Sequence, residues 1–341
     1  MRSSLNQTQL VWGIMAAIAR HLHGAARAGA GAAPSDLRRL ATSRKRIAWA
    51  WAWAAVVCWG VMFPVGDLLL KRGNMPPASV GFFRYLAASP ILLGAAFASC
   101  GRAAWPRGIR GWIAVAALGL IGSAAMAQLL FMAQETVASV NASLLEAYVP
   151  MQVLMLSFLA GRRPCAREAV SVALGFAGSL LVLRAVDGAG TNLGALGTGD
   201  AFVFLSGLCW AVYTALGRDT VRSMGPLPFT AWTVFFGAAW LLVFQLARGH
   251  APTPPGSALE IWCISFLAVF PTCVAFLGWN EAHKGMSLES LSFMEYLPPL
   301  VAAASGAVFF GEQITAWQWF GIFVVIASAM IRRHGAGLAA S

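Results

Sequence analysis

One stretch of the chain, residues 289–313, is long and apolar enough to cross a bilayer and yet carries a carboxylate, Glu295, in its interior. Burying a charge at that depth costs about 2.5–3.5 kcal/mol, so the residue needs a functional or structural reason. A similar stretch, residues 141–163, carries Glu146. Each copy places a tyrosine and a proline after the acid: Tyr296 with Pro298 and Pro299, and Tyr148 with Pro150. Two copies of one membrane segment indicate a duplicated membrane protein.

The composition of the chain excludes an ordinary soluble domain. It is 59% hydrophobic and 11% charged, whereas soluble domains are about 25% charged, and its mean hydropathy is +0.69. The 341 residues leave room for about ten spans of roughly 20 residues each. We predict an all-α membrane protein with ten transmembrane helices at residues 47–70, 78–98, 112–132, 141–160, 169–186, 199–217, 229–247, 261–280, 289–310 and 317–331.

The net charge of +11 follows from where the basic residues lie between these spans. Nineteen Lys or Arg lie on the side that would hold the N-terminus, four lie on the other side, and Arg84 lies inside a span. An excess of basic residues marks the cytoplasmic side, so both termini are expected in the cytoplasm. The charge is therefore an orientation signal, and no nucleic-acid partner is expected. The content of Ala, Gly and Arg favours a bacterial inner membrane.

The chain divides into a basic extension and two similar halves. Residues 1–46 are rich in Arg and small residues and are expected to be a disordered extension, whereas residues 334–341 form a short tail. Cys58-Trp59 in the half at 47–186 matches Cys209-Trp210 in the half at 199–333, at an offset of 151 residues. Each half holds five predicted spans, and an odd number inverts the second half relative to the first. We therefore predict two inverted five-helix repeats.

These motifs resemble the EamA-type repeat of the drug/metabolite transporter superfamily over about residues 47–333. The resemblance is carried by a Cys-Trp pair, an Arg in the second span, a Pro in the fourth, a Gly-acid pair and a small-residue fifth span: Cys58-Trp59, Arg84, Pro150, Ser171, Gly175 and Gly178 in the first half, and Gly199-Asp200, Cys209-Trp210, Pro298, Gly311-Glu312 and Gly321 in the second. The sequence departs from the pattern at Arg162, which replaces an acid, and at Phe235, which is equivalent to Arg84. The resemblance implies export of small metabolites by alternating access.

The two acids are the first candidate binding residues. Ser143, Glu146 and Pro150 share one helix face, and a polar face with a helix-breaking Pro is typical of a water-filled cavity. We expect Glu146 and Glu295 to face such a cavity and to bind a cation, a proton or a substrate amino group. The alternative is that each acid stabilises a neighbouring span or lies near an interface.

Further candidates lie in the middle of the predicted spans. Arg84 could extend to the membrane surface, pair with Glu146, or bind a substrate carboxylate. The aromatic candidates for the substrate site are Trp59, Trp210, Tyr213, Tyr148 and Tyr296. The alternative is a purely structural role, in which these rings fill the core or lie at the membrane interfaces, as aromatic residues of membrane proteins commonly do.

The function most consistent with these features is a secondary transporter that exports small, amino-acid-like solutes, with a proton as the candidate coupling ion. The partners expected are the substrate and the lipid bilayer, and the oligomeric state is not predicted. The alternatives are a non-transporting membrane partner and a membrane-embedded enzyme. We expect no enzyme, cofactor or metal, because no nucleotide-binding loop, catalytic motif or histidine cluster is present in the sequence.

Overall fold

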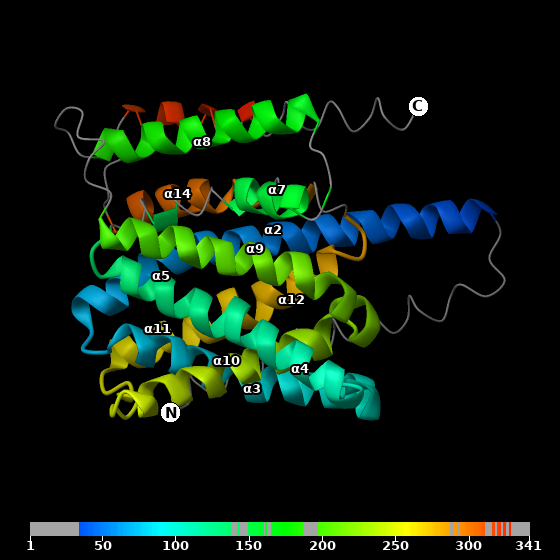
Figure 1. The fold of residues 1–341 in the computed structure, drawn as a ribbon, viewed down its shortest axis with the longest axis horizontal. Helices are drawn as coiled ribbons and strands as arrows, with labels where there is room; N and C mark the ends of the chain where they lie inside the picture. Colours follow the sequence, from blue (N-terminus) through cyan, green and yellow to red (C-terminus); the bar gives the residue numbers. More distant parts are fainter. Residues whose placement is uncertain are drawn as a thin grey trace.

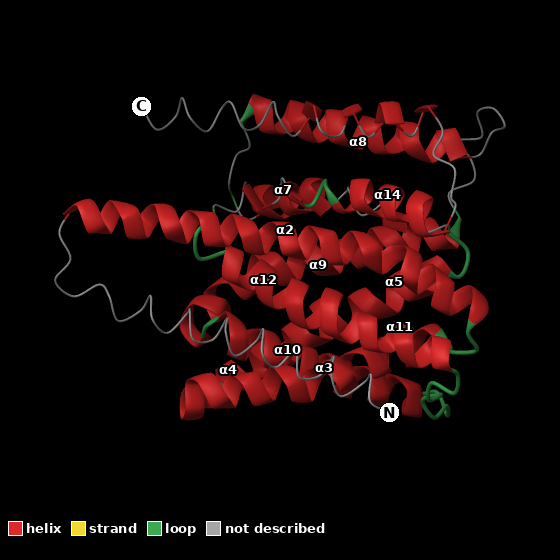
Figure 2. Ribbon diagram, turned by 180° about the vertical axis from the view of Figure 1, so that it is seen from behind, coloured by secondary structure: helices red, strands yellow, loops and turns green. Residues whose placement is uncertain are grey.

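In the computed structural model, the described residues are 34–137, 142–143, 149–159, 161, 165–186, 197–286, 290–291, 294–310, 316–317, 319–321, 323–324 and 327–328. Within these residues every regular element is a helix, and strands are absent (Figure 2). Helices satisfy their own backbone hydrogen bonds, which is why a chain this apolar can cross a bilayer as a bundle. The predicted all-helical membrane class is confirmed.

Within the described residues, six helical segments are long and apolar enough to cross a membrane. Four are single helices: α2 (Pro34–Arg72), α3 (Pro77–Cys100), α9 (Thr198–Met224) and α10 (Pro226–Ala247). Two are composite: α4 (Gly108–Gly119), η2 (Leu120–Ala125) and α5 (Met126–Gln134), and α11 (Ala258–Ala268), η4 (Val269–Val274) and α12 (Ala275–Ala282). The protein is thus a multi-pass membrane protein.

Three further helices lie where spans four, five and nine are predicted. They are α7 (Val149–Leu159), α8 (Ala166–Val186) and α14 (Pro298–Phe310), and a short 3-10 helix, η1 (Gly101–Ala104), follows α3. The hydroxyl of Ser171 in α8 donates to the carbonyl of Ser328 at 2.6 Å, so α8 packs against the tenth predicted span. The total of ten spans stays a prediction.

The first helix begins well before its predicted span. Helix α2 starts at Pro34, so residues 34–46, which we expected to be disordered, are helical (Figure 1). The correction has a physical reason: Leu, Ala, Arg and Lys are good helix formers, and a helix already anchored in the bundle can extend without a new nucleation step. The rest of the predicted extension, residues 1–33, lies outside the described residues.

The first helix of each half packs against helices of the other half. Helix α2 of the first half packs against α12 and α14 of the second, and α9 of the second half packs against α5 and α7 of the first. We call α2, α12 and α14 the first trio, and α9, α5 and α7 the second trio. Helices α3 and α10 pack against each other, and α2 and α9 run in opposite directions (Figure 1).

Two π-helical turns interrupt the composite helices at matching places. They are η2 and η4, whose first residues, Leu120 and Val269, are separated by 149 positions. A π turn shifts the register of a helix and leaves carbonyl groups for other partners, and such turns are frequent at functional sites. Turn η2 packs against α9 and α10, whereas η4 packs against α2 and α3.

Hydrogen bonds join the halves at the end of the bundle where α2 stops. The carboxylate of Glu260 in α11 accepts the backbone N–H of Asn74 at 2.7 Å and those of Gly256 and Ser257 at 2.8 and 2.9 Å. The hydroxyl of Ser79 in α3 donates to Gln245 of α10 at 2.9 Å. Loops from both halves therefore close this end of the bundle.

Candidate functional site

A cavity in the middle of the bundle lies between the two trios. The first trio contributes Trp59, Met62, Phe276, Glu295 and Pro298, the second contributes Met126, Leu130, Val149 and Trp210, and α3 contributes Arg84. Its volume is about 40 Å³, which suits a few water molecules. The cavity therefore lies where relative movement of the trios would change its size.

Among the described residues that line the cavity, Arg84 is the only basic one. The side chain is fully buried, and Nε donates to the hydroxyl of Thr272 at 2.6 Å. Nη2 lies 3.4 Å from the carbonyl oxygen of Pro271, and Nη1 contacts the sulfur of Met62 at 3.2 Å. The ring centroids of Tyr85 and Phe131 lie 5.1 and 5.9 Å from its central carbon. This burial does not fit the alternative in which Arg84 extends to the membrane surface.

The π turn η4 supplies the groups that hold Arg84. Pro271 has no N–H, so the carbonyl of Leu267 one turn earlier loses its usual helical partner. The hydroxyl of Thr272 donates to that carbonyl at 2.8 Å, and its oxygen remains free to accept from Arg84. The carbonyl of Pro271 also accepts the indole N–H of Trp59 at 3.1 Å. The break in one helix is thus filled by side chains from two others.

The negative charge of the cavity is Glu295, which precedes α14. Its side chain is buried, and Oε1 accepts the indole N–H of Trp210 at 3.1 Å. Trp210 belongs to the second trio, so this hydrogen bond crosses the cavity. The rings of Trp59 and Trp210 meet edge to face with centroids 5.1 Å apart, and Trp279 lies 5.2 Å from Trp59. The described lining of the cavity therefore offers the guanidinium of Arg84, the carboxyl group of Glu295 and an aromatic wall.

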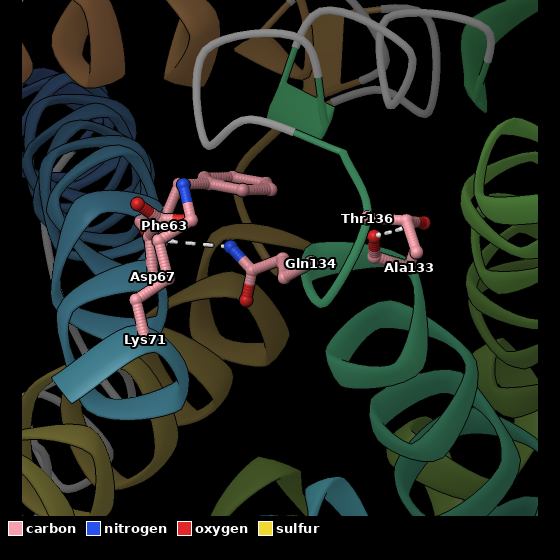
Figure 3. Close-up of polar contacts among 6 residues, drawn as sticks. All are labelled: Phe63, Asp67, Lys71, Ala133, Gln134 and Thr136. Carbon is pink, nitrogen blue, oxygen red and sulfur yellow. Dashed lines mark hydrogen bonds and ion pairs between the residues drawn. The ribbon is translucent and has the colours of Figure 1, made fainter. Parts of the chain in front are cut away.

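The two trios also touch beyond the cavity, toward the end of α2. There the amide of Gln134, the last residue of α5, donates to the carbonyl of Phe63 in α2 at 3.1 Å (Figure 3). One turn further along α2, Lys71 and Asp67 form an ion pair at 2.9 Å, and Gln134 points toward this stretch of the helix (Figure 3). A Cβ added at Gly66 would lie 2.6 Å from the side-chain oxygen of Gln134, so the helices approach closely. The two trios are thus in direct contact here.

The structure brings four predicted site residues together at the cavity and places two elsewhere. Trp59, Arg84, Trp210 and Glu295 line it. Tyr213 stacks on Trp210 but lies behind it, where its hydroxyl accepts from Asn280 at 3.3 Å. Tyr296 is directed at α8, since its hydroxyl would lie 3.1 Å from a Cβ at Gly175. Glu146 and Tyr148 lie outside the described residues. A role in substrate binding stays a prediction for all of these residues.

The residues that hold Arg84 were not predicted as site residues. Thr272 and Pro271 lie in an apolar run that reads as an ordinary span, and the sequence carries no pattern for a π turn. A proline followed by a hydroxyl residue in the middle of a span is the one signal that could have identified them, because Pro leaves a free carbonyl for a neighbouring donor. The apolar lining residues, such as Met62 and Phe276, resemble any other core residue.

The chain is similar in sequence to several proteins that are named as uncharacterized transporters. An uncharacterized transporter of Archaeoglobus fulgidus is 26% identical over 288 residues, covering 81% of this chain and 93% of the relative. The uncharacterized transporter YyaM of Bacillus subtilis is 29% identical over 63% of this chain and 72% of its own length. The uncharacterized inner membrane transporter YedA of Escherichia coli is 23% identical over 82% of this chain and 88% of its own.

A solved structure with a similar fold and a protein-family model both match this chain. A crystal structure superposes with a TM-score of 0.68 over 88% of this chain and 99% of that chain, and at 18% identity this likeness concerns the fold alone. The model of the EamA-like transporter family matches this chain twice, over residues 46–184 and 197–332. Most of the chain is covered by these two matches, one for each half. The chain therefore belongs to the EamA-like transporter family.

Proposed function

We propose that this protein is a secondary active transporter that exports small, amino-acid-like solutes from the cell. The observation that carries the proposal is the cavity between the two trios of helices, which is lined by the guanidinium of Arg84 and the carboxyl group of Glu295. In membrane proteins, ionisable residues placed at mid-membrane and directed at a cavity commonly mark a substrate or ion pathway. The family relationship supports transport in general. The charged residues of the cavity support a substrate that carries complementary charges.

The charges of the cavity favour a zwitterionic substrate. Arg84 presents a fixed guanidinium, whose geometry suits a carboxylate, and Glu295 can pair with an ammonium group. The indole rings of Trp59 and Trp210 form an apolar wall between them. A volume of about 40 Å³ is too small for such a solute, so the structure represents a closed arrangement and the trios must separate for the substrate to enter.

Alternating access is the mechanism that this architecture supports. We infer ten spans in two inverted repeats with both termini in the cytoplasm, and a site in the bacterial inner membrane. In inverted-repeat carriers the two bundles rock around a central site, which opens first to one side and then to the other. The exchanged packing would make the two trios the moving bodies, while α3 and α10 remain packed against each other.

The coupling ion is inferred to be a proton carried by a cavity carboxylate. Glu295 is described in the structure, whereas Glu146 is a candidate from the sequence alone. Transport by the parent protein should then depend on pH, and Glu146→Gln or Glu295→Gln should abolish this dependence. An unchanged pH dependence in both variants would exclude both acids from coupling.

Reconstituted protein tests the proposed function directly. Proteoliposomes loaded with an unlabelled amino acid should accumulate the labelled form by counterflow, tested across a panel of zwitterionic, acidic and basic amino acids. Arg84→Gln and Glu295→Gln should reduce counterflow of the zwitterion, whereas Trp262→Phe, which alters an exposed ring outside the cavity, should not. Counterflow that is absent for the whole panel, or equal in all variants, would contradict the proposal.

A further inference from the structure

Five exposed cations gather at the end of the bundle where α2 begins. Arg44, Lys45 and Arg46 lie on α2, and Arg218 and Arg222 lie on the last two turns of α9. In the described part of the chain, none of the five takes part in an ion pair with a carboxylate. We call these five residues the basic end cluster.

The turn after α12 connects the two parts of this cluster in space. It packs on α2 so closely that a Cβ at Gly285 would lie 3.1 Å from the carbonyl oxygen of Arg44. Two residues earlier, burial and the charges of Arg218 and Arg222 lower the pKa of His283 to about 4. The same short turn therefore touches α2 and lies within the electrostatic field of the α9 cations.

Few acids offset this positive charge. Glu281 is already engaged by Lys284, with a distance of 2.9 Å between carboxylate and ammonium. Asp219, next to Arg218, is the remaining acid on this end of α9. The region is positive because cations from segments about 170 residues apart meet at one end of the bundle, which the order of the sequence does not reveal.

We infer that the basic end cluster binds the phosphate of an anionic phospholipid headgroup. Arg46 directly precedes Ile47, where the apolar part of α2 begins, so the cluster lies at the level of the headgroups. Arg binds phosphate oxygens through paired N–H groups, and basic residues beside a span attract anionic lipids. Because α2 belongs to the first trio and α9 to the second, the cluster draws its cations from both trios. This inference does not depend on the substrate or on the transport mechanism.

The experiment compares lipids of different charge on the purified full-length protein in detergent. Phosphatidylglycerol should raise the Tm of the parent by about 2–4 °C at low salt, whereas phosphatidylcholine should leave it unchanged. The shift should shrink at 0.5 M salt because the exposed charges are screened. Arg218→Gln with Arg222→Gln should lose most of the shift. The matched control, Arg107→Gln with Arg110→Gln, removes two exposed cations from the start of α4 and should keep it.

Three outcomes would overturn the inference. Phosphatidylglycerol without effect on the parent would exclude the site, and equal loss of the shift in the test and control variants would indicate a general charge effect. A shift reproduced by inorganic phosphate at the same concentration would identify a soluble anion as the ligand instead of a lipid. If the α9 variant does not elute as a single species, Arg44→Gln with Lys45→Gln and Arg46→Gln tests the same site from α2 and should lose the shift equally.

Discussion

At the scale of single residues, the two breaks in the composite helices are filled differently. Thr272 in η4 receives a hydrogen bond from Arg84 at 2.6 Å. Its equivalent in η2, 149 positions earlier, is Ser123, whose buried hydroxyl has no partner among the described residues. The equivalent of Arg84 is Phe235, whose side chain is 39% exposed and offers no donor. The two halves therefore differ chemically at this structural position, where the first half places Arg84 at the cavity and the second half has Phe235.

Thr272→Val tests how the guanidinium is held. The substitution preserves shape but removes the oxygen that accepts from Arg84 Nε, so the free energy of unfolding should fall by about 1.5–3 kcal/mol. Thermal unfolding in detergent measures the change. Thr272→Ser keeps the hydroxyl and should retain most of the stability. Equal losses in Val and Ser variants would mean that packing at Thr272, and not the hydrogen bond, is what matters.

Trp210→Phe tests the contact that crosses the cavity. Phenylalanine keeps an aromatic ring but lacks the second ring and the N–H that binds Glu295, so we expect a loss of at least about 1–2 kcal/mol in the free energy of unfolding. Trp262→Phe is the matched control, because that indole is 51% exposed and makes no hydrogen bond in the described part of the protein. The prediction fails if the two variants unfold at the same temperature.

At the scale of elements, the two π turns pack against different helices: η2 against α9 and α10, and η4 against α2 and α3. Turn η2 approaches its neighbours through glycine: a Cβ at Gly122 would overlap the ring of Tyr213, and one at Gly237 of α10 would lie 2.5 Å from the Cβ of Ser123. Turn η4 instead accepts the side chains of Arg84 and Trp59. Glycine at the first turn permits close helix packing, and polar donors fill the second.

Gly122→Ala should therefore destabilise the packing of η2. A methyl group placed against Tyr213 forces a shift of the ring or of the helix, at a cost of about 1–3 kcal/mol. Gly111→Ala in α4 provides the comparison, because its Cβ would make only ordinary contact, 3.5 Å from Pro106. Thermal unfolding should show a lower Tm for the first variant and an equal or higher Tm for the second, since Ala favours helix over Gly. Equal Tm values of the two variants would show that the packing around Gly122 can accommodate a methyl group without loss of stability.

At the scale of the whole molecule, the exchange of helices ties each half to the other. The first helix of each half packs in a trio whose other two helices belong to the other half. Neither half can then be removed without breaking a trio, so we expect the two halves to unfold as one unit. The cavity lies where the trios meet, which makes its size a property of the whole bundle.

The orientation of the bundle can be tested by labelling cysteines in intact cells. With both termini in the cytoplasm, a membrane-impermeant maleimide should react with Arg72→Cys at the end of α2 and not with Ser43→Cys at its start. Both positions are exposed, so a difference in labelling reports the side of the membrane. The parent protein, with its six native cysteines, gives the background. Labelling of Ser43→Cys alone would reverse the orientation, which rests on the distribution of basic residues.

Much of the architecture could be predicted because the bilayer limits what an apolar chain can do. A run of about 20 apolar residues must become a helix in lipid, so the positions of α3, α9 and α10 follow from hydropathy alone. The repeat followed from motifs at a constant offset, and the mid-span charges Arg84 and Glu295 stood out because charge is rare at that depth. These properties belong to single segments and need no knowledge of their neighbours.

Only the tertiary structure decided which segments meet. It brings Trp210 to Glu295 across 85 positions and Arg84 to Thr272 across 188, and it directs Tyr296 toward α8 and away from the cavity. The choice of neighbours among apolar helices depends on small residues, local breaks in the helix and single hydrogen bonds, because lipid itself does not favour one apolar contact over another. The sequence by itself therefore determined that the chain spans the membrane as a duplicated bundle of helices. The contacts between distant helices determined where its charges lie and what they can bind.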